Sequence, residues 1–198
     1  MKPKAPGYDF RVVASEGHAR AAELTTPHAV VSTPTFMPVG TQGCVKTLTP
    51  SEVEATGARI VLGNTYHLWL RPGAEAVAAF GSLHGFSRWP HAMLTDSGGF
   101  QAFSLAKLRK ATEDGFFFRS HIDGSARHLS PEEAMRVQGL LGADIAMQLD
   151  VCPPGGAPKD EIARACATTT RWARRCLAAR REDQAVFGIV QGGCDVDL

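Results

Sequence analysis

The chain has 198 residues, a formal net charge of +1, 44% hydrophobic residues and 21% charged residues. This balance is typical of a soluble globular domain with one core, and it offers no bulk charge that would indicate nucleic-acid binding. No apolar run is long enough to cross a bilayer, and the opening MKPKAPGYDF lacks the apolar segment of a secretory signal. We therefore expect a cytoplasmic protein that does not enter a membrane.

The cysteines indicate reduced thiols. Their number is odd and no two of them form a Cys-x-x-Cys pair, so the sequence predicts neither a disulfide framework nor a metal site. The five are Cys44, Cys152, Cys166, Cys176 and Cys194.

The predicted elements begin with an antiparallel hairpin or meander over about residues 8–33, where FRVVAS and HAVVSTP flank a glycine turn. From residue 34 onward, short apolar runs alternate with helical segments. The runs TPTFMPVG, ARIVLGN, HAMLTDSGG, ADIAMQLD and AVFGIVQGG predict five strands. The polar or glycine residues at their ends are Gly40, Asn64, Asp96, Asp150 and Gln191.

Two helices carry the same start signal, in which a capping hydroxyl is followed by proline and, three residues after the cap, by glutamate. Thr49 starts a helix that Gly57 ends, and Ser130 starts one that Gly142 ends. A weaker helix is expected over residues 72–81 and a long one over about 159–182. Between them, GFFFRSHIDGSARHLS predicts a hairpin that turns at Asp123-Gly124.

This alternation predicts βαβ units and a parallel sheet covered on both faces. Five strands complete an open doubly wound sheet, whereas a (β/α)8 barrel needs three more. The antiparallel preface and the inserted hairpin favour the barrel, and periodicity alone leaves both architectures open. In either, the residues that follow the strands meet at one edge, where the chemistry of such folds takes place.

The stretch LTDSGGFQ places Asp96 where a strand becomes a turn. Ser97 follows it, and then Gly98 and Gly99, which let a ligand approach the backbone closely. A solvated aspartate that opens a glycine turn explains the pattern equally well. Phe100 is more often a core residue than a plate on which a base stacks.

Asp150 follows a buried strand, where a carboxylate is costly unless a partner satisfies it. The partner is either internal or a ligand with two adjacent N–H donors, such as the ring N–H and exocyclic amine of guanine. Gln191 offers both a donor and an acceptor to complete that edge. Cys152 is interpreted as an unreactive thiol, because no base lies near it in sequence.

Other polar residues have a structural interpretation. His67 and His121 show no metal spacing and are predicted to be structural. The arginines of the long helix are predicted to form a solvated face rather than an RNA-binding patch.

Five motifs together indicate a family. GNTYHLWLRPG, LTDSGGFQ, SHIDGS, QLDVCPP and FGIVQGG occur in the order and approximate spacing of the tRNA-guanine transglycosylases, also called queuine tRNA-ribosyltransferases. The sequence resembles that family from about Phe10 to its last residue. The resemblance implies a (β/α)8 barrel that exchanges guanine at the wobble position of tRNAs with a GUN-type anticodon for a free 7-deazaguanine. It implies a double displacement at the ribose anomeric carbon, with two carboxylates and a covalent intermediate.

The motifs carry the family's roles onto numbered residues. Asp96 corresponds to the catalytic aspartate in the general acid/base role. The resemblance implies that Asn64 lies beside the ribose and that Phe100 stacks on the base. The other residues that match the substrate site are Ser97, Gly98, Gly99, Asp150, Gln191 and Gly192.

Two residues bear on which base is used. Val39 and Cys152 match the bacterial pattern, which implies 7-aminomethyl-7-deazaguanine of the queuosine pathway as the incoming base. Val151 departs from it, since many bacterial members have glutamate there, and Trp69 is a second, smaller departure.

Family members continue into a further strand, a segment with the nucleophilic aspartate and a cysteine-rich structural zinc site. No motif for these occurs within residues 1–198. We therefore expect the amino-terminal portion of one barrel domain, ending after about five barrel strands, with a preface over about 8–33 and β/α units over about 34–198. We expect it to hold no cofactor and to be inactive alone, and the full-length protein to bind zinc and form a homodimer.

Three alternatives stay open. One is a non-catalytic partner subunit of a transglycosylase heterodimer. Another is an unrelated small α/β enzyme that uses Asp96 and Asp150 as an acid/base pair. The third is an archaeal type that inserts a different deazaguanine elsewhere in tRNA.

Overall fold

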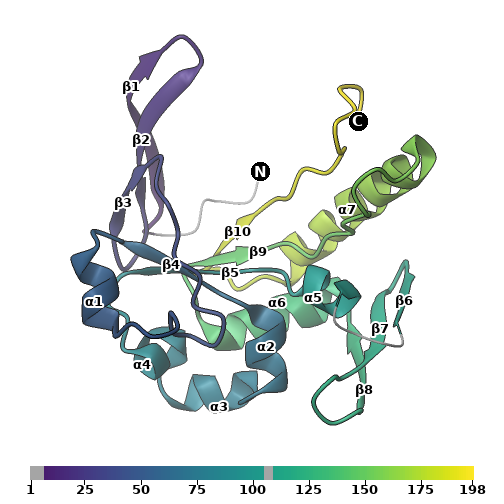
Figure 1. The fold of residues 1–198 in the computed structure, drawn as a ribbon, viewed down its shortest axis with the longest axis horizontal. Helices are drawn as coiled ribbons and strands as arrows, with labels where there is room; N and C mark the ends of the chain where they lie inside the picture. The colour runs from purple at the N-terminus through teal and green to yellow at the C-terminus, as the bar shows by residue number, and fades with distance from the viewer. Residues whose placement is uncertain (1–6, 105–108) are drawn as a thin grey trace.

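The computed structural model describes residues 7–104 and 109–198, which form three sheets and seven helices (Figure 1). In chain order the elements are β1 (Asp9–Glu16), β2 (Ala19–Thr25), β3 (Val30–Thr33), α1 (Pro50–Ala55), β4 (Ile60–Gly63), α2 (Thr65–Leu70), α3 (Ala74–Ala79), α4 (Ser82–Ser87), β5 (Ala92–Thr95), α5 (Gly99–Ser104), β6 (Arg109–Thr112), β7 (Gly115–Arg119), β8 (Ala126–Leu129), α6 (Pro131–Leu141), β9 (Ile145–Met147), α7 (Lys159–Ala179) and β10 (Ala185–Phe187). No helix in these two ranges is long and apolar enough to span a membrane.

The central sheet is wholly parallel, with strand order β10-β9-β5-β4. This order follows the chain, without the reversal that marks the switch point of a doubly wound sheet. Right-handed crossovers that all advance in one direction place their helices on the same face. Accordingly, α1, α4 and α6 lie on one side of the sheet in Figure 1, and the β1–β3 sheet rises on the other.

Alternate residues of the strands belong to two separate cores. Val61, Met93 and Ala146 pack with the helices, in a cluster that also contains Leu68, Val77, Met135, Leu141 and Trp172. Ile60, Ala92, Leu94 and Ile145 form the other cluster, with Val31 and the partly buried Tyr8, Leu24 and Met37 of the amino-terminal region. The prediction of a parallel sheet covered on both faces is therefore confirmed, with helices on one face and the β1–β3 sheet on the other.

The first of the five predicted strands, within residues 33–40, is wrong as a strand. Thr33 ends β3, where it pairs with Ala22, and of residues 34–40 only Val39 pairs, in a single parallel bridge with Leu62. Pro38 accepts the Leu62 N–H at 2.9 Å, and the Gly40 N–H donates to the Leu62 carbonyl at 2.7 Å. Pro34 and Pro38 have no N–H to donate, so a longer ladder cannot form. The bridge still places Val39 beside β4, next in line in the sheet.

The predicted helix starts are confirmed. The Thr49 hydroxyl accepts the Glu52 N–H at 3.3 Å and the Glu52 carboxylate accepts the Thr49 N–H at 2.7 Å, which completes a capping box. Ser130 accepts the Glu133 N–H at 3.1 Å, but the Glu133 carboxylate pairs with Arg136 instead. The second box is thus only half formed, because a stronger charged partner lies one turn away.

The predicted hairpin with its Asp123-Gly124 turn is confirmed as β7 and β8, and β6 adds a third antiparallel strand that the sequence did not reveal. This sheet packs against α7. The rings of Phe116 and Trp172 meet edge to face at 5.3 Å, and the Trp172 indole donates to the Glu113 carbonyl at 2.8 Å. The insertion therefore fixes α7 beside the strand ends.

Candidate active site

The carboxyl ends of the parallel strands carry the predicted site residues. Asn64 directly follows β4 and Asp96 directly follows β5. Asp150 and Gln191 lie a few residues beyond β9 and β10. Because neighbouring parallel strands end at the same edge, these four side chains come from adjacent positions across the sheet.

The Asp96 carboxylate is held by the start of α2. Oδ1 accepts the Thr65 N–H at 2.7 Å, and Oδ2 accepts the Asn64 side-chain amide and the Gln101 amide, the latter at 3.1 Å. Asn64 occupies the cap position of α2 without capping it, since its side chain is used on Asp96. Burial raises the pKa of Asp96, although the hydrogen bonds from Asn64 and Thr65 oppose the shift. A carboxyl group in this environment is suited to carry a proton.

The two glycines of LTDSGGFQ serve different contacts. Gly98 has a φ of +75°, which disfavours any residue with a Cβ, and a Cβ there would lie 3.2 Å from the Tyr66 nitrogen. A Cβ on Gly99 would lie 3.1 Å from the Asp150 carbonyl oxygen. Gly98 is therefore favoured by its backbone conformation, and at Gly99 the backbone comes close to the backbone of Asp150. The stretch is also more than a turn, because α5 begins at Gly99.

Asp150 is 8% exposed and its two carboxylate oxygens have separate donors. The Ser97 hydroxyl donates to Oδ1 at 3.0 Å and the Gln191 amide donates to Oδ2 at 2.7 Å. Burial raises the pKa of Asp150, the hydrogen bonds from Ser97 and Gln191 oppose the rise, and the charge of Asp96 adds to it. The structure thus brings Ser97, Asp150 and Gln191 into direct contact and places Asp96 close enough for its charge to act on Asp150.

The remaining predicted residues lie around this centre. Phe100 is 60% exposed on α5, so its interpretation as a core residue is wrong and its ring is free to stack. Val39 is exposed at the edge of the sheet, and Gly192 is buried directly after Gln191. Burial and the charge of Asp150 raise the pKa of the exposed Cys152 thiol, which argues against a thiolate nucleophile.

Two further residues of the site were missed in the sequence. Thr65 reaches Asp96 through its amide and through its hydroxyl, which donates to the Asp96 carbonyl at 2.6 Å. Gln101 reaches the same carboxylate from α5, and its side-chain oxygen is buried without a hydrogen-bond partner in the described structure. The sequence signal available for Gln101 was the FQ that ends LTDSGGFQ. The Thr65 contact is made by a backbone amide, which any residue except proline has, so the residue type could not indicate it.

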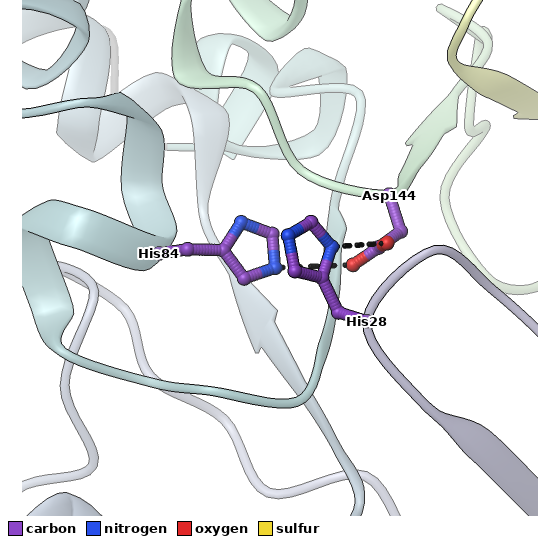
Figure 2. A group of neighbouring side chains, drawn as sticks. All are labelled: His28, His84 and Asp144. Carbon is purple, nitrogen blue, oxygen red and sulfur yellow. Dashed lines mark hydrogen bonds and ion pairs between the residues drawn. The ribbon is translucent and has the colours of Figure 1, made fainter.

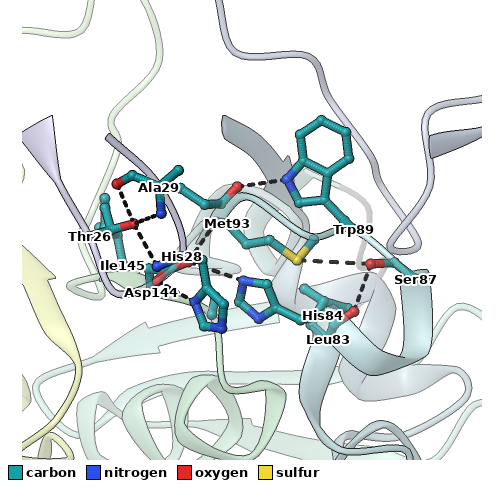
Figure 3. A network of polar contacts seen from close by, with 12 residues as sticks. Thr26, His28, Ala29, Leu83, His84, Ser87, Trp89, Met93, Asp144 and Ile145 are labelled. Carbon is teal, nitrogen blue, oxygen red and sulfur yellow. Dashed lines mark hydrogen bonds and ion pairs between the residues drawn. The ribbon is translucent and has the colours of Figure 1, made fainter. Parts of the chain in front are cut away.

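A second polar cluster lies at the opposite edge of the sheet, where Asp144 precedes β9 (Figure 2). His28 Nδ1 lies 2.7 Å from one carboxylate oxygen of Asp144 and His84 Nε2 lies 3.1 Å from the other. The Met93 N–H also donates to Asp144 at 2.8 Å (Figure 3). These contacts lower the pKa of Asp144 against the effect of its burial. The cluster ties the β2–β3 loop and α4 to the start of β9.

The cluster fits hydrogen bonding better than metal binding. The two imidazole rings are stacked, with centroids 3.8 Å apart and planes at 18°, so their nitrogens point side by side at two oxygens rather than at one centre. His84 Nδ1 is buried without a partner, whereas a metal-bound histidine usually donates its other N–H. Among the described residues this is the one group of three potential ligands, and it contains no cysteine.

Comparison of the sequence with protein-family models decides the family of the chain. The family model for queuine tRNA-ribosyltransferase matches residues 15–198, which is nearly the whole chain. The chain belongs to the queuine tRNA-ribosyltransferase family. This agrees with the resemblance seen in the five motifs, and it assigns the chain to a family of glycosyltransferases that modify tRNA.

Relatives in this family are similar over most of the chain. A queuine tRNA-ribosyltransferase of Sorangium cellulosum is 71% identical over 195 residues, which cover 98% of this chain and 50% of the relative. Those of Moorella thermoacetica and Mesorhizobium japonicum are 57% and 54% identical, over 91% and 98% of this chain and 48% and 52% of the relatives. The chain therefore spans about half the length of the curated relatives it matches.

Proposed function

We propose that this chain supplies the base-binding half of a tRNA-guanine transglycosylase. The complete enzyme would exchange guanine at the wobble position of tRNAs with a GUN-type anticodon for 7-aminomethyl-7-deazaguanine. The observation that carries the proposal is the arrangement of Ser97, Asp150 and Gln191, with both oxygens of one buried carboxylate holding exchangeable donors. The family to which the chain belongs supports the same reaction.

Asp150 would read the edge of the purine. Guanine presents its ring N–H and exocyclic amine side by side, and one carboxylate accepts both. In the structure, the Ser97 hydroxyl and the Gln191 amide occupy those two acceptor positions. On binding, the two guanine donors replace them, and the Gln191 amide is released to bond another group on the base. The desolvated carboxylate thus keeps two donors that favour its ionised form, which oppose the rise in pKa that burial causes.

Asp96 would transfer the proton. Its pKa is raised by burial, and Asn64, Thr65 and Gln101 fix the carboxyl group from three directions. A group in this state can protonate a departing base and accept the proton of an incoming one. A double displacement also needs a nucleophile at the anomeric carbon, and no motif for it occurs in residues 1–198. We therefore propose that this chain alone binds the base without exchanging it.

The full-length context extends this proposal. Parallel strands in chain order, with helices on one face, are the pattern that closes into a (β/α)8 barrel when further units follow. In that barrel the second core, which contains Leu94 and Ile145, would lie inside. We propose a cytoplasmic homodimer that carries its structural zinc outside this chain, with Phe100 stacked on the base and Val39 and Cys152 lining the base site.

Equilibrium dialysis with radiolabelled guanine tests the proposal. Hypoxanthine is the matched competitor, because it lacks only the 2-amino group that Asp150 would bind. We expect the chain to prefer guanine, and Asp150→Ala to lose that preference. Asp160→Ala, at an exposed carboxylate in the first turn of α7, is the control and should bind like the unaltered chain. Equal binding of the two bases by the unaltered chain would reject the proposed role of Asp150.

A further inference from the structure

The segment that carries Asp150 leaves the sheet before it reaches that residue. β9 ends at Met147, and the Gln148 N–H makes a last bond to the neighbouring strand, at 3.0 Å from the Phe187 carbonyl. The amides on either side of Asp150, those of Leu149 and Val151, donate to side chains instead. The backbone orientation at Asp150 therefore depends on the side chains that accept these two amides.

Both acceptors come from α7. The Thr169 hydroxyl accepts the Val151 N–H at 3.0 Å, and the Cys176 sulfur accepts the Leu149 N–H at 3.4 Å. Seven residues separate the two, which is close to two turns, so they share one face of the helix. The Thr169 carbonyl also accepts the Gln148 side-chain amide at 3.3 Å. The helix α7 therefore holds two backbone amides, those of Leu149 and Val151, and the side chain of Gln148 around the carboxylate.

Both side chains are fully packed, Thr169 being 2% and Cys176 0% exposed. Burial raises the pKa of the Cys176 thiol to about 11, so it stays neutral and acts only as a hydrogen-bonding group. Its S–H is directed to the Pro131 carbonyl at 3.7 Å, at the start of α6. We call Thr169 and Cys176, with the two amides they accept, the clamp. The clamp is anchored in two helices, and the buried Thr169 hydroxyl cannot exchange the Val151 amide for water.

We propose that Thr169 and Cys176 are positioning residues that aim the Asp150 carboxylate at the two donors of a guanine edge. This inference rests on the proposed function of Asp150. The clamp acts on the backbone, while Ser97 and Gln191 hold the carboxylate oxygens and are displaced when the base binds. After that displacement, the contacts from α7 are what keep the carboxylate plane aligned with the base.

Three variants separate positioning from simple stability. Thr169→Val keeps the shape of the side chain and removes the acceptor, while Thr169→Ser restores the hydroxyl. Thr170→Val makes the same substitution one residue further on, at an exposed position of the same helix. Guanine and hypoxanthine affinities are measured by equilibrium dialysis, well below the unfolding midpoint of each variant.

We expect Thr169→Val to bind guanine about tenfold more weakly and to lose most of its preference over hypoxanthine, since an orphaned buried amide shifts to find another partner. Thr169→Ser and Thr170→Val should stay within about twofold of the unaltered chain. A Thr169→Val variant that keeps both the affinity and the preference overturns the inference. An unaltered chain without any preference instead rejects the proposed role of Asp150, and the positioning role with it.

Amide hydrogen exchange tests the clamp without a ligand. The Val151 amide should exchange at least about tenfold faster in Thr169→Val than in the unaltered chain, with no change in Thr170→Val. Equal Val151 exchange in Thr169→Val and the unaltered chain would show that the hydroxyl does not hold this amide, and would also overturn the inference.

Discussion

Replacing Asp144 by alanine should destabilise the chain by about 4 kcal/mol. The carboxylate is fully buried and accepts from His28, His84 and the Met93 N–H. His28 is 43% exposed and can turn to water, whereas His84 is 10% exposed and the Met93 amide is buried. Two buried donors then lack a partner, and each costs about 1–3 kcal/mol.

This loss of stability is measured by urea unfolding monitored by circular dichroism. The control is Asp160→Ala, which removes an exposed carboxylate paired with Arg164. For a chain of this size, about 4 kcal/mol corresponds to a fall of about 8–16 °C in the thermal midpoint. The control should unfold at nearly the same urea concentration as the unaltered chain, because exposed ion pairs contribute little to stability. A loss below about 1 kcal/mol for Asp144→Ala would refute the assignment of the cluster as a main attachment of the amino-terminal sheet.

The stabilisation that Asp144 contributes should depend on pH. Because its contacts lower the pKa of Asp144, its stabilisation is complete above the unfolded-state pKa of about 3.9 and is lost as pH falls through the lower folded-state value. The stability difference between the unaltered chain and Asp144→Ala should therefore hold from pH 7 to about pH 5 and shrink near pH 3. A difference that grows on acidification would contradict this account.

Three other outcomes are expected. Gly99→Ala should weaken guanine binding at least about tenfold, measured by dialysis, because its Cβ would meet the Asp150 carbonyl oxygen at 3.1 Å; unchanged affinity would contradict the close approach. Gln138→Met should lower the free energy of unfolding by about 2–4 kcal/mol, measured in urea, because the buried Gln138 amide forms hydrogen bonds with both the N–H and the carbonyl of Met147 at 2.9 Å. A loss below about 1 kcal/mol would be inconsistent with these bonds. Residues 1–198 incubated with tRNA and radiolabelled guanine should incorporate no label above background; sustained turnover would show that the nucleophile lies within this chain.

Much of the architecture could be predicted because its signals are local. The caps at Thr49 and Ser130 and the turn at Asp123-Gly124 depend on a few neighbouring residues, and each lies where the sequence places it. The helices α2 and α4 gave no such signal. Tyr66 and Leu68 of α2 are fully buried, so tertiary packing rather than capping or propensity holds that helix.

The candidate site was predictable to the extent that its residues follow strands. Asp96, Asp150 and Gln191 were found because polar residues after apolar runs stand out. The His28–His84–Asp144 cluster was not predicted because its residues are far apart in the sequence. His84 is 60 residues and His28 is 116 residues from Asp144, and none of the three is part of a recognisable motif. The same holds for Thr169, whose importance comes from the backbone amide it accepts.

The most direct test is a crystal structure of this chain with guanine bound. We predict that both Asp150 oxygens lie within about 3 Å of the guanine ring N–H and 2-amino nitrogens, with Gln191 moved off the carboxylate and Phe100 against the face of the ring. Guanine bound elsewhere, or bound while Ser97 and Gln191 keep their present bonds to Asp150, would contradict it.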